Sequence, residues 1–315
     1  LFLTTKVTSE ILQSERLNWN DHISLPLNEK LLLVNLKVNE IFPWPNELSA
    51  GINKLNFNTS FLIQPDVFVR VRPGKLEVLN KKLYAAQIGF KQIGEYCLAV
   101  ENGTMLENVI DINKEGVIQD LNSQRVGELL PVNDVGMSAK VWDCCAASGG
   151  KSIMAYDLIP GIHLTVSDVR QTIIQNLHSR FKSARVTNYD YFVADLTDAK
   201  DLHCLKNKFF DLIICDAPCS GSGTWSRTPE QLLFFKPEEI IRYSSLQKRI
   251  AANAVSYLNK GGYFLYITCS VFKKENEEVA EFIESQTGLI LLKMELLKGY
   301  DLKADTMFAA LFKLT

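Results

Sequence analysis

The sequence lacks several features that would place it in a specialised class of proteins. No apolar run approaches the roughly 18 to 20 residues that a membrane span needs, and the opening stretch LFLTTKVTSE has neither the apolar core nor the cleavage site of a secretory signal. The 315 residues contain no repeat and no low-complexity linker. A hydrophobic fraction of 47% and a charged fraction of 22% are typical of a globular protein with a core. We therefore expect a cytoplasmic monomer without membrane association.

Cysteine spacing of the kind found in zinc sites is also absent. The seven cysteines include no Cys-x-x-Cys pair, so we expect no metal site, and their odd number argues against a disulfide framework. Free thiols fit a reducing compartment. The net charge is −2, and both parts of the chain, divided near Arg125, are close to neutral. This balance counts mildly against nucleic-acid binding, which usually leaves a basic footprint, although local basic patches remain open.

From about residue 125 onward, short apolar runs alternate with helical patterns. The runs have few polar interruptions, as expected of strands covered on both faces. This alternation predicts a doubly wound α/β sheet whose ligands lie at the carboxyl ends of the strands. The expected strands are 140–145, 163–168, 191–195, 210–217, 261–269, 289–295 and 307–314, and the expected helices are 151–159, 170–181, 237–258 and 275–286.

The N-terminal part predicts a smaller α+β module. We place this module at residues 1–115, with a helical remnant within 1–60, and the α/β domain at 116–315. The stretch 116–130 is interpreted as a helix bracing the second domain. Because the sequence begins with Leu1, we expect residues to be missing before it.

The stretch DCCAASGGKS at 143–152 resembles a phosphate-binding loop only superficially. A P-loop would need glycine at position 145, which is Cys145, so an ATPase is a weak alternative. The remaining pattern is small residues and glycines before a helix start, where free N–H groups favour a carboxylate or phosphate. Asp143, Asp168 and Asp195 follow three successive strands, and such acids can take ribose hydroxyls. Together they favour S-adenosylmethionine, although each acid alone fits a helix N-cap.

Two further motifs place cysteines at strand ends. DAPCSGSGTW contains Cys219, and TCSVFKKENEEV contains Cys269. Neighbouring parallel strands would bring both thiols into one crevice. A thiolate is a good nucleophile when its pKa is lowered or a base is near. The other candidates are interpreted as small buried hydrophobes or loop residues: Cys97, Cys144, Cys204 and Cys215.

These three motifs resemble those of the Fmu/Sun (RsmB/RsmF-type) RNA (cytosine-5)-methyltransferases, over roughly residue 66 to the C-terminus. The resemblance implies a Rossmann-like S-adenosylmethionine-dependent methyltransferase domain. It implies Cys269 as the nucleophile that adds to cytosine C6, Cys219 as the residue that helps to resolve the adduct, and Asp216 as a partner of the base. The implied cofactor site comprises Cys145, Ala146, Ala147, Ser148, Gly149, Gly150, Lys151, Asp168, Asp195 and Asp216.

Two departures from the family pattern are visible. Ser148 stands where the family usually has proline, which stiffens a loop, so we expect looser cofactor binding at most. Arg72 stands where the family usually has asparagine. A local basic cluster suggests RNA contacts at Arg70, Arg72, Lys75 and Arg227, although scattered solvated charges are an equally good interpretation of each.

The sequence therefore predicts an RNA cytosine-5 methyltransferase, with ribosomal RNA as the first candidate substrate and tRNA as the second. The main alternative is a non-catalytic RNA-binding or ribosome-assembly factor with a degenerate cofactor loop. Ser148 and the weak basic character favour that alternative, whereas the intact Cys219 and Cys269 oppose it.

Overall fold

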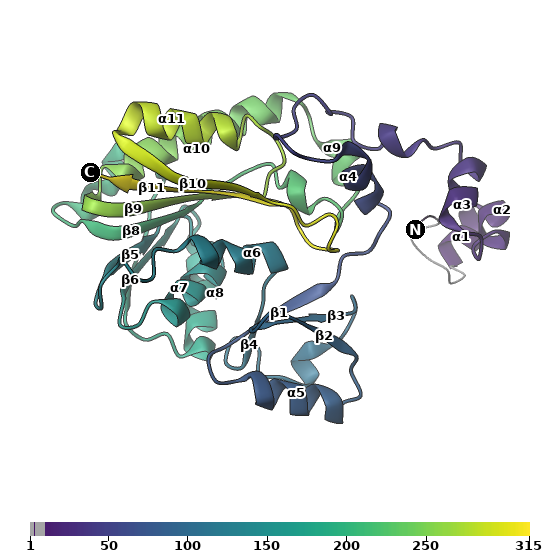
Figure 1. Ribbon diagram of the computed structural model, residues 1–315, viewed down its shortest axis with the longest axis horizontal. Helices are drawn as coiled ribbons and strands as arrows, with labels where there is room; N and C mark the ends of the chain where they lie inside the picture. Colours follow the sequence, from purple (N-terminus) through teal and green to yellow (C-terminus); the bar gives the residue numbers. More distant parts are fainter. Residues whose placement is uncertain (1–2, 4–9) are drawn as a thin grey trace.

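A seven-stranded sheet forms the centre of the molecule in the computed structural model, which describes residue 3 and residues 10–315 (Figure 1). The strand order is β10-β11-β9-β8-β5-β6-β7. Strands β5 to β9 run parallel, and β11 and β10 add two antiparallel strands at one edge. The strands are β5 (Lys140–Asp143), β6 (His163–Asp168), β7 (Tyr189–Val193), β8 (Phe210–Asp216), β9 (Leu258–Thr268), β10 (Leu289–Leu297) and β11 (Met307–Leu314).

Helices cover both faces of this sheet. One face packs against α7 (Gly150–Leu158) and α8 (Gln171–Ala184), and the other against α10 (Glu238–Val255) and α11 (Glu277–Thr287) (Figure 1). Alternate residues of each strand enter the two cores, so Ile214 faces α7 and α8 while Ile213 and Cys215 face α10. The predicted α/β architecture is confirmed.

A second sheet of four antiparallel strands, in the order β2-β3-β1-β4, lies beside the first. Helix α5 (Leu76–Ala85) buries Leu79 and Leu83 against one face of it. The strands are β1 (Val67–Val71), β2 (Phe90–Ile93), β3 (Cys97–Val100) and β4 (Gly116–Ile118). An α+β module is thus present before the large sheet.

The stretch 116–130 is not one helix, contrary to the prediction. Residues 116–118 form β4, which pairs with β1, so the small sheet extends past residue 115. Val117 and Ile118 are β-branched and favour a strand. Asp120 then caps a new helix by accepting a hydrogen bond from the Asn122 amide, and α6 (Leu121–Arg125) and η3 (Val126–Leu129) follow.

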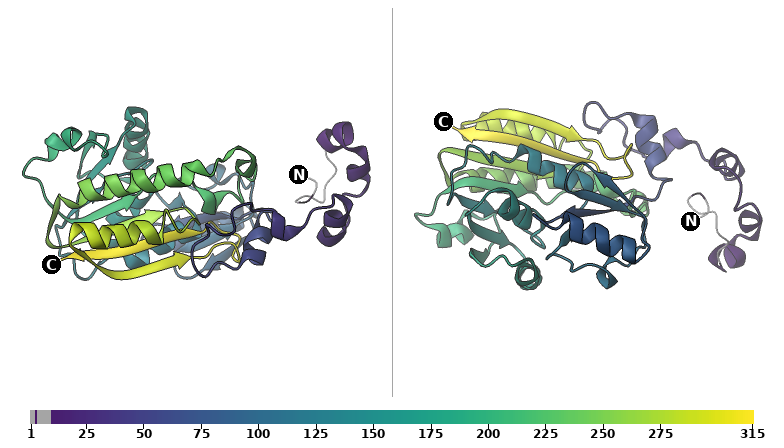
Figure 2. Two further views of the ribbon diagram at one scale, coloured as in Figure 1. Left: turned by 90° about the horizontal axis from the view of Figure 1, so that it is seen from above. Right: turned by 60° about the horizontal axis from the view of Figure 1, so that its bottom comes forward.

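The chain before β1 contains two separate parts. Helices α1 (Glu10–Glu15), α2 (Leu17–Asp21) and α3 (Leu27–Leu33) form an arm that extends away from the two sheets (Figures 1 and 2). Residues 41–61, which follow η1 (Val38–Glu40) and include α4 (Lys54–Ser60), instead pack on the loops that follow β8 and β9. An aromatic cluster joins them: Phe42, Phe57, Phe61, Trp225 and Phe272.

The remaining short elements are η2 (Leu106–Asn108), η4 (Ala199–Leu205), η5 (Ser222–Thr224) and α9 (Gln231–Phe234). Across the described residues, no helix combines the length and the apolar character needed to cross a membrane.

Candidate active site

The two cysteines at the ends of β8 and β9 lie side by side. Strand β8 pairs in parallel with β9, and Asp216 stands opposite Ile267. Cys219 follows Asp216 by three residues and Cys269 follows Ile267 by two, and their Sγ atoms lie 3.2 Å apart. Both side chains are half-buried. The expectation that parallel strands bring the two thiols into one crevice is confirmed.

The two thiols differ in their surroundings. The hydrogen bond with Cys269, together with burial, raises the pKa of Cys219 well above its ordinary value. Cys219 therefore stays protonated near neutral pH and is suited to donate its hydrogen bond to Cys269. The pair is poised with one thiol as donor and the other as acceptor.

A buried carboxylate, Glu275, holds the two cysteine loops together. Its Oε2 accepts hydrogen bonds from the Ser220 amide and from Gln247 Nε2, both at 2.9 Å, and its Oε1 accepts one from Ser270 Oγ at 2.9 Å. Glu275 thus contacts the residue that follows each cysteine. The sequence analysis missed it, because it lies in the charged run KKENEE, which has the composition of a solvated surface.

Gly223 allows the loop after β8 to pass close to Thr306, the residue that directly precedes β11. A Cβ atom at this position would lie 1.9 Å from the Thr306 carbonyl oxygen. The Gly223 amide donates to the Cys269 carbonyl, and its own carbonyl accepts from the Thr306 amide, both at 2.9 Å. Glycine is required here because two backbones touch.

Lys151 brings a positive charge to the same place. Its Nζ lies 2.6 Å from Asp216 Oδ2 and 3.3 Å from Ser123 Oγ, and the side chain is almost fully buried. Burial lowers the pKa of Lys151, but the Asp216 carboxylate outweighs it, with a further contribution from Cys269, so that the pKa is raised overall. The ammonium ion therefore persists and brings a positive charge to the side of the site that Cys269 lines.

Two cavities meet at these residues. The larger, of about 660 Å³, is lined by Cys145, Ala147, Asp168, Asp195 and Cys219, with α10 on its far side. The smaller, of about 280 Å³, is lined by the other thiol, Cys269, together with Ala146, Ala147, Ser148, Gly150 and Lys151. Asp216 lines both. The thiol pair therefore stands where the two cavities adjoin.

The predicted cofactor residues divide between these cavities. Asp168 accepts hydrogen bonds from the Ala147 amide at 3.1 Å and from Arg170 Nε at 3.0 Å. Asp195 accepts from the Thr197 amide and hydroxyl. Gly149 packs against α8, and a Cβ atom at this position would lie 2.5 Å from the ring of Phe181. Asp143, interpreted as one of three acids facing the cofactor, is instead fully buried beneath the loop.

Ser148 is held in place by α8. Its Oγ lies 2.7 Å from Arg180 Nη1, which also approaches the Ser148 carbonyl at 3.3 Å. Ala147 and Gly149 have positive φ angles of 46° and 82° and make the turn on either side. The arginine thus supplies a restraint on the loop at the position where the family usually has proline.

Three predicted RNA contacts are used within the chain instead. Arg70 Nη1 and Arg72 Nη2 lie 2.7 and 2.6 Å from Asp157, which is on α7. Arg227 lies 2.8 Å from Asp120 and 2.7 Å from Asp305. Each of these guanidinium groups is thus bound to buried or partly buried carboxylates of the same chain, and its contact with RNA stays a prediction. Lys75 is half-buried and stays a prediction.

The Arg227 cluster makes the stability depend on pH. Burial and the neighbouring Asp120 carboxylate raise the pKa of Asp305 from 3.8 to about 6. The folded state therefore binds a proton that the unfolded state releases above about pH 4, and the free energy of unfolding falls as the pH rises to about 6, by about 2 to 3 kcal/mol. Urea titrations at pH 4 and pH 6.5 will measure this difference. In Asp305→Asn the difference should shrink by that amount, and an unchanged difference would contradict the assignment.

Comparisons with known proteins agree with this fold. A methyltransferase homolog protein from Pyrococcus horikoshii superimposes with a TM-score of 0.71 at 19% identity, covering 91% of this chain and 98% of that one. NSun6 from Pyrococcus horikoshii, crystallised with SFG, gives a TM-score of 0.71 at 15% identity, covering 82% and 94%. The fold is that of the Rossmann-like methyltransferases.

The family follows from the sequence match. Residues 130–310 match the family described as 16S rRNA methyltransferase RsmB/F, and the chain belongs to that family. Ribosomal RNA small subunit methyltransferase B of Xylella fastidiosa (strain 9a5c) is 32% identical over 170 residues, which are 54% of this chain and 39% of that protein. The probable enzyme of the same name in Bacillus subtilis (strain 168) is 29% identical over 196 residues, 58% and 42% of the two chains. This chain spans about two fifths of these relatives.

Proposed function

We propose that this protein transfers a methyl group from S-adenosylmethionine to C5 of a cytosine in RNA, with ribosomal RNA as the substrate. The observation that carries the proposal is the pair of thiols 3.2 Å apart, one lining each of two adjoining cavities. The larger cavity suits the cofactor and the smaller one the target base. The names of the curated relatives support ribosomal RNA over tRNA.

The chemistry needs two thiols with different tasks. Cytosine C5 is a weak nucleophile, and addition of the Cys269 thiolate to C6 makes C5 enamine-like. C5 then attacks the methyl group, which the cofactor supplies as an electrophile. A base then removes the C5 proton, the electron pair of that C–H bond restores the C5–C6 double bond, and Cys269 leaves C6 as a thiolate. Such covalent catalysis divides one difficult step into easier ones.

The described residues fit these tasks. Lys151 places a positive charge at the cavity that Cys269 lines, and Cys219, 3.2 Å from Cys269, is placed to assist the breakdown of the adduct. Asp216, between the cavities, would meet the base near N3. The target base must leave its stack to reach Cys269, because a stacked base cannot enter a cavity of this kind.

The larger cavity fits S-adenosylmethionine by its donors and acceptors. Asp168 is the last residue of β6, and its side chain is 6% exposed. Its ion-pair partner Arg170 has a long side chain that is largely exposed to solvent. Ribose hydroxyls can therefore replace the arginine at low cost. Leu196, Leu246 and Ile250 supply an apolar wall for the adenine. The residues that would hold the cofactor are Cys145, Ala147, Asp168, Asp195 and Asp216.

The direct test is transfer of labelled methyl from S-adenosylmethionine to unmodified small-subunit ribosomal RNA, with unmodified tRNA in parallel. Label on cytosine C5 of the ribosomal RNA is expected. Label on tRNA alone would reassign the substrate. Cofactor binding without transfer to either RNA would favour the alternative of a non-catalytic RNA-binding or assembly factor.

Removal of Asp168 should weaken cofactor binding. A hydrogen bond to a charged group contributes about 1.5 to 3 kcal/mol, so Asp168→Ala should raise the Kd for S-adenosylmethionine by about 10- to 100-fold. Isothermal titration calorimetry will measure it. The matched control is Asp190→Ala, which removes an exposed carboxylate near the start of β7 and should leave the Kd unchanged. Equal Kd values for both variants would exclude Asp168 from the cofactor site.

A further inference from the structure

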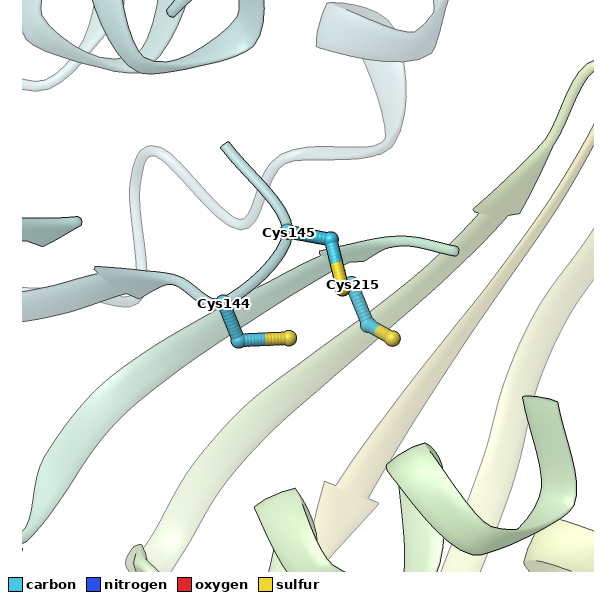
Figure 3. A group of neighbouring side chains, drawn as sticks. All are labelled: Cys144, Cys145 and Cys215. Atoms are coloured by element: carbon cyan, nitrogen blue, oxygen red, sulfur yellow. The ribbon is translucent and has the colours of Figure 1, made fainter. Parts of the chain in front are cut away.

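Three cysteines gather beneath the larger cavity, at the carboxyl ends of β5 and β8 (Figure 3). The two strands are parallel, with Asp143 opposite Ile214, and the Cys144 amide donates to the Ile214 carbonyl at 2.9 Å. This register sets Cys144 beside Cys215. The next residue, Cys145, begins the glycine-rich loop, and the three Sγ atoms all lie within 4.8 Å of one another.

The cluster is enclosed on one side and open on the other. Cys144 and Cys215 are 0% exposed and belong to the core beneath α10. Cys145 is half-buried and lines the larger cavity together with part of Cys144. A small ion can therefore reach the thiols through the cavity, and two of the three ligands are already fixed by packing.

Acidic residues adjoin two of the three cysteines. Asp143 directly precedes Cys144, and Asp216, which is paired with Lys151, directly follows Cys215. Asp143 Oδ2 accepts from Ser152 Oγ at 2.5 Å, but its buried Oδ1 has no hydrogen-bond partner within the described part of the chain. A buried polar atom without a partner is costly and calls for an explanation. The cluster therefore adjoins a buried polar position that the described residues leave unsatisfied.

We propose that Cys144, Cys145 and Cys215 form a site for a thiophilic divalent cation of the zinc class. Three thiolates around a metal at about 2.3 Å require sulfur–sulfur distances of about 4 Å, which the cluster reaches with small side-chain rotations. Thiolate sulfur selects such soft or borderline ions over magnesium or calcium. Each ligand releases its proton to solvent when the ion binds. The fourth coordination position faces the cavity.

This site goes beyond methyl transfer and needs none of its chemistry. One consequence rests on the proposed function: because Cys145 serves both the cluster and the cofactor cavity, the ion and S-adenosylmethionine should compete. Metal binding itself is independent of that competition and can be measured without RNA or cofactor.

The experiment uses the full chain and Cd²⁺ as a spectroscopic probe. Cys219 and Cys269 would also bind a thiophilic ion, and Cys204 is exposed, so the host variant carries Cys204→Ser, Cys219→Ser and Cys269→Ser. We expect one Cd²⁺ per host chain, retained on gel filtration, with an ultraviolet sulfur-to-cadmium charge-transfer band and a raised thermal midpoint. Added Cd²⁺ should also displace Zn²⁺ from a host that was first loaded with Zn²⁺, because thiolates prefer the softer ion.

Paired substitutions within this host identify the ligands. Cys144→Ala and Cys215→Ala each remove a proposed ligand. Each should weaken Cd²⁺ binding by more than roughly 10- to 100-fold, which is the loss typical of removing a residue that only supports a ligand. Cys97→Ala, which removes a buried cysteine of the small sheet, is the control and should leave the affinity unchanged. Far-ultraviolet circular dichroism verifies that each variant is folded.

Two results would overturn the site. A folded host that binds no Cd²⁺ would exclude it, as would a host whose binding survives Cys144→Ala and Cys215→Ala. Methyl transfer by the wild-type chain is assayed separately, so a failure of the metal site cannot be confused with a failure of the proposed activity.

Discussion

Replacement of Cys269 by alanine is expected to abolish methyl transfer, whereas replacement of Cys219 is expected to leave RNA covalently attached to the protein. Without the Cys269 thiolate, C5 is never activated, and loss of a covalent nucleophile lowers turnover on the order of 10⁴-fold or more. Without Cys219, addition and methyl transfer remain possible, but the thiol that lies 3.2 Å from Cys269 no longer assists release.

Denaturing gels with labelled RNA separate the two outcomes. Cys219→Ala should produce a slowly migrating protein–RNA band that grows with S-adenosylmethionine, and Cys269→Ala should produce none. Cys204→Ala, at an exposed thiol remote from both cavities, is the control and should behave as the wild type. An adduct in Cys269→Ala instead would exchange the two roles.

Removal of Asp157 is expected to destabilise the protein by about 3 to 5 kcal/mol, because it leaves two buried cations without a carboxylate partner. Arg70 of β1 and Arg72, which directly follows β1, both bind this carboxylate of α7, and its side chain is only 4% exposed. The three residues form an ionic connection between the small sheet and α7. Urea denaturation of Asp157→Asn, which keeps the size of the side chain, measures the loss.

A matched control is available on the surface. Asp190 also meets two basic side chains, His163 at 3.3 Å and Lys208 at 3.7 Å, but it is 53% exposed. Exposed pairs contribute about 0 to 1 kcal/mol, so Asp190→Asn should change the free energy of unfolding little. Equal effects of the two substitutions would show that the Asp157 cluster does not support the fold.

Much of the large sheet could be predicted because its strands are covered on both faces. The runs at 163–168 and 307–314 were expected with the bounds that the structure has, since each follows a clear break in the sequence pattern. The juxtaposition of Cys219 and Cys269 followed from the same rule of parallel strands. Strand β4 was missed because three residues carry too short a pattern to separate from the helix that follows.

What could not be predicted at the site has a common cause: charge and spacing do not report which side chains meet. The ion pairs of Arg70, Arg72 and Arg227 are not visible in the sequence, since their carboxylate partners lie 78 or more residues away along the chain. Glu275 was hidden in a charged run. The spacing of the cysteines does not show that Cys144 and Cys215 meet through the pairing of β5 with β8.

Residues 41–61 set a lower limit on the length of a working protein. They cover Trp225 and Phe272 beside the loops that carry Cys219 and Cys269, and Ser49 binds both Glu277 and Asn276 within the motif that contains Cys269. The family match begins only at residue 130. A protein trimmed to that match would keep every candidate catalytic residue but expose the aromatic side chains that order their loops. The family match at residues 130–310 is therefore shorter than the part of the chain that packs around the candidate site.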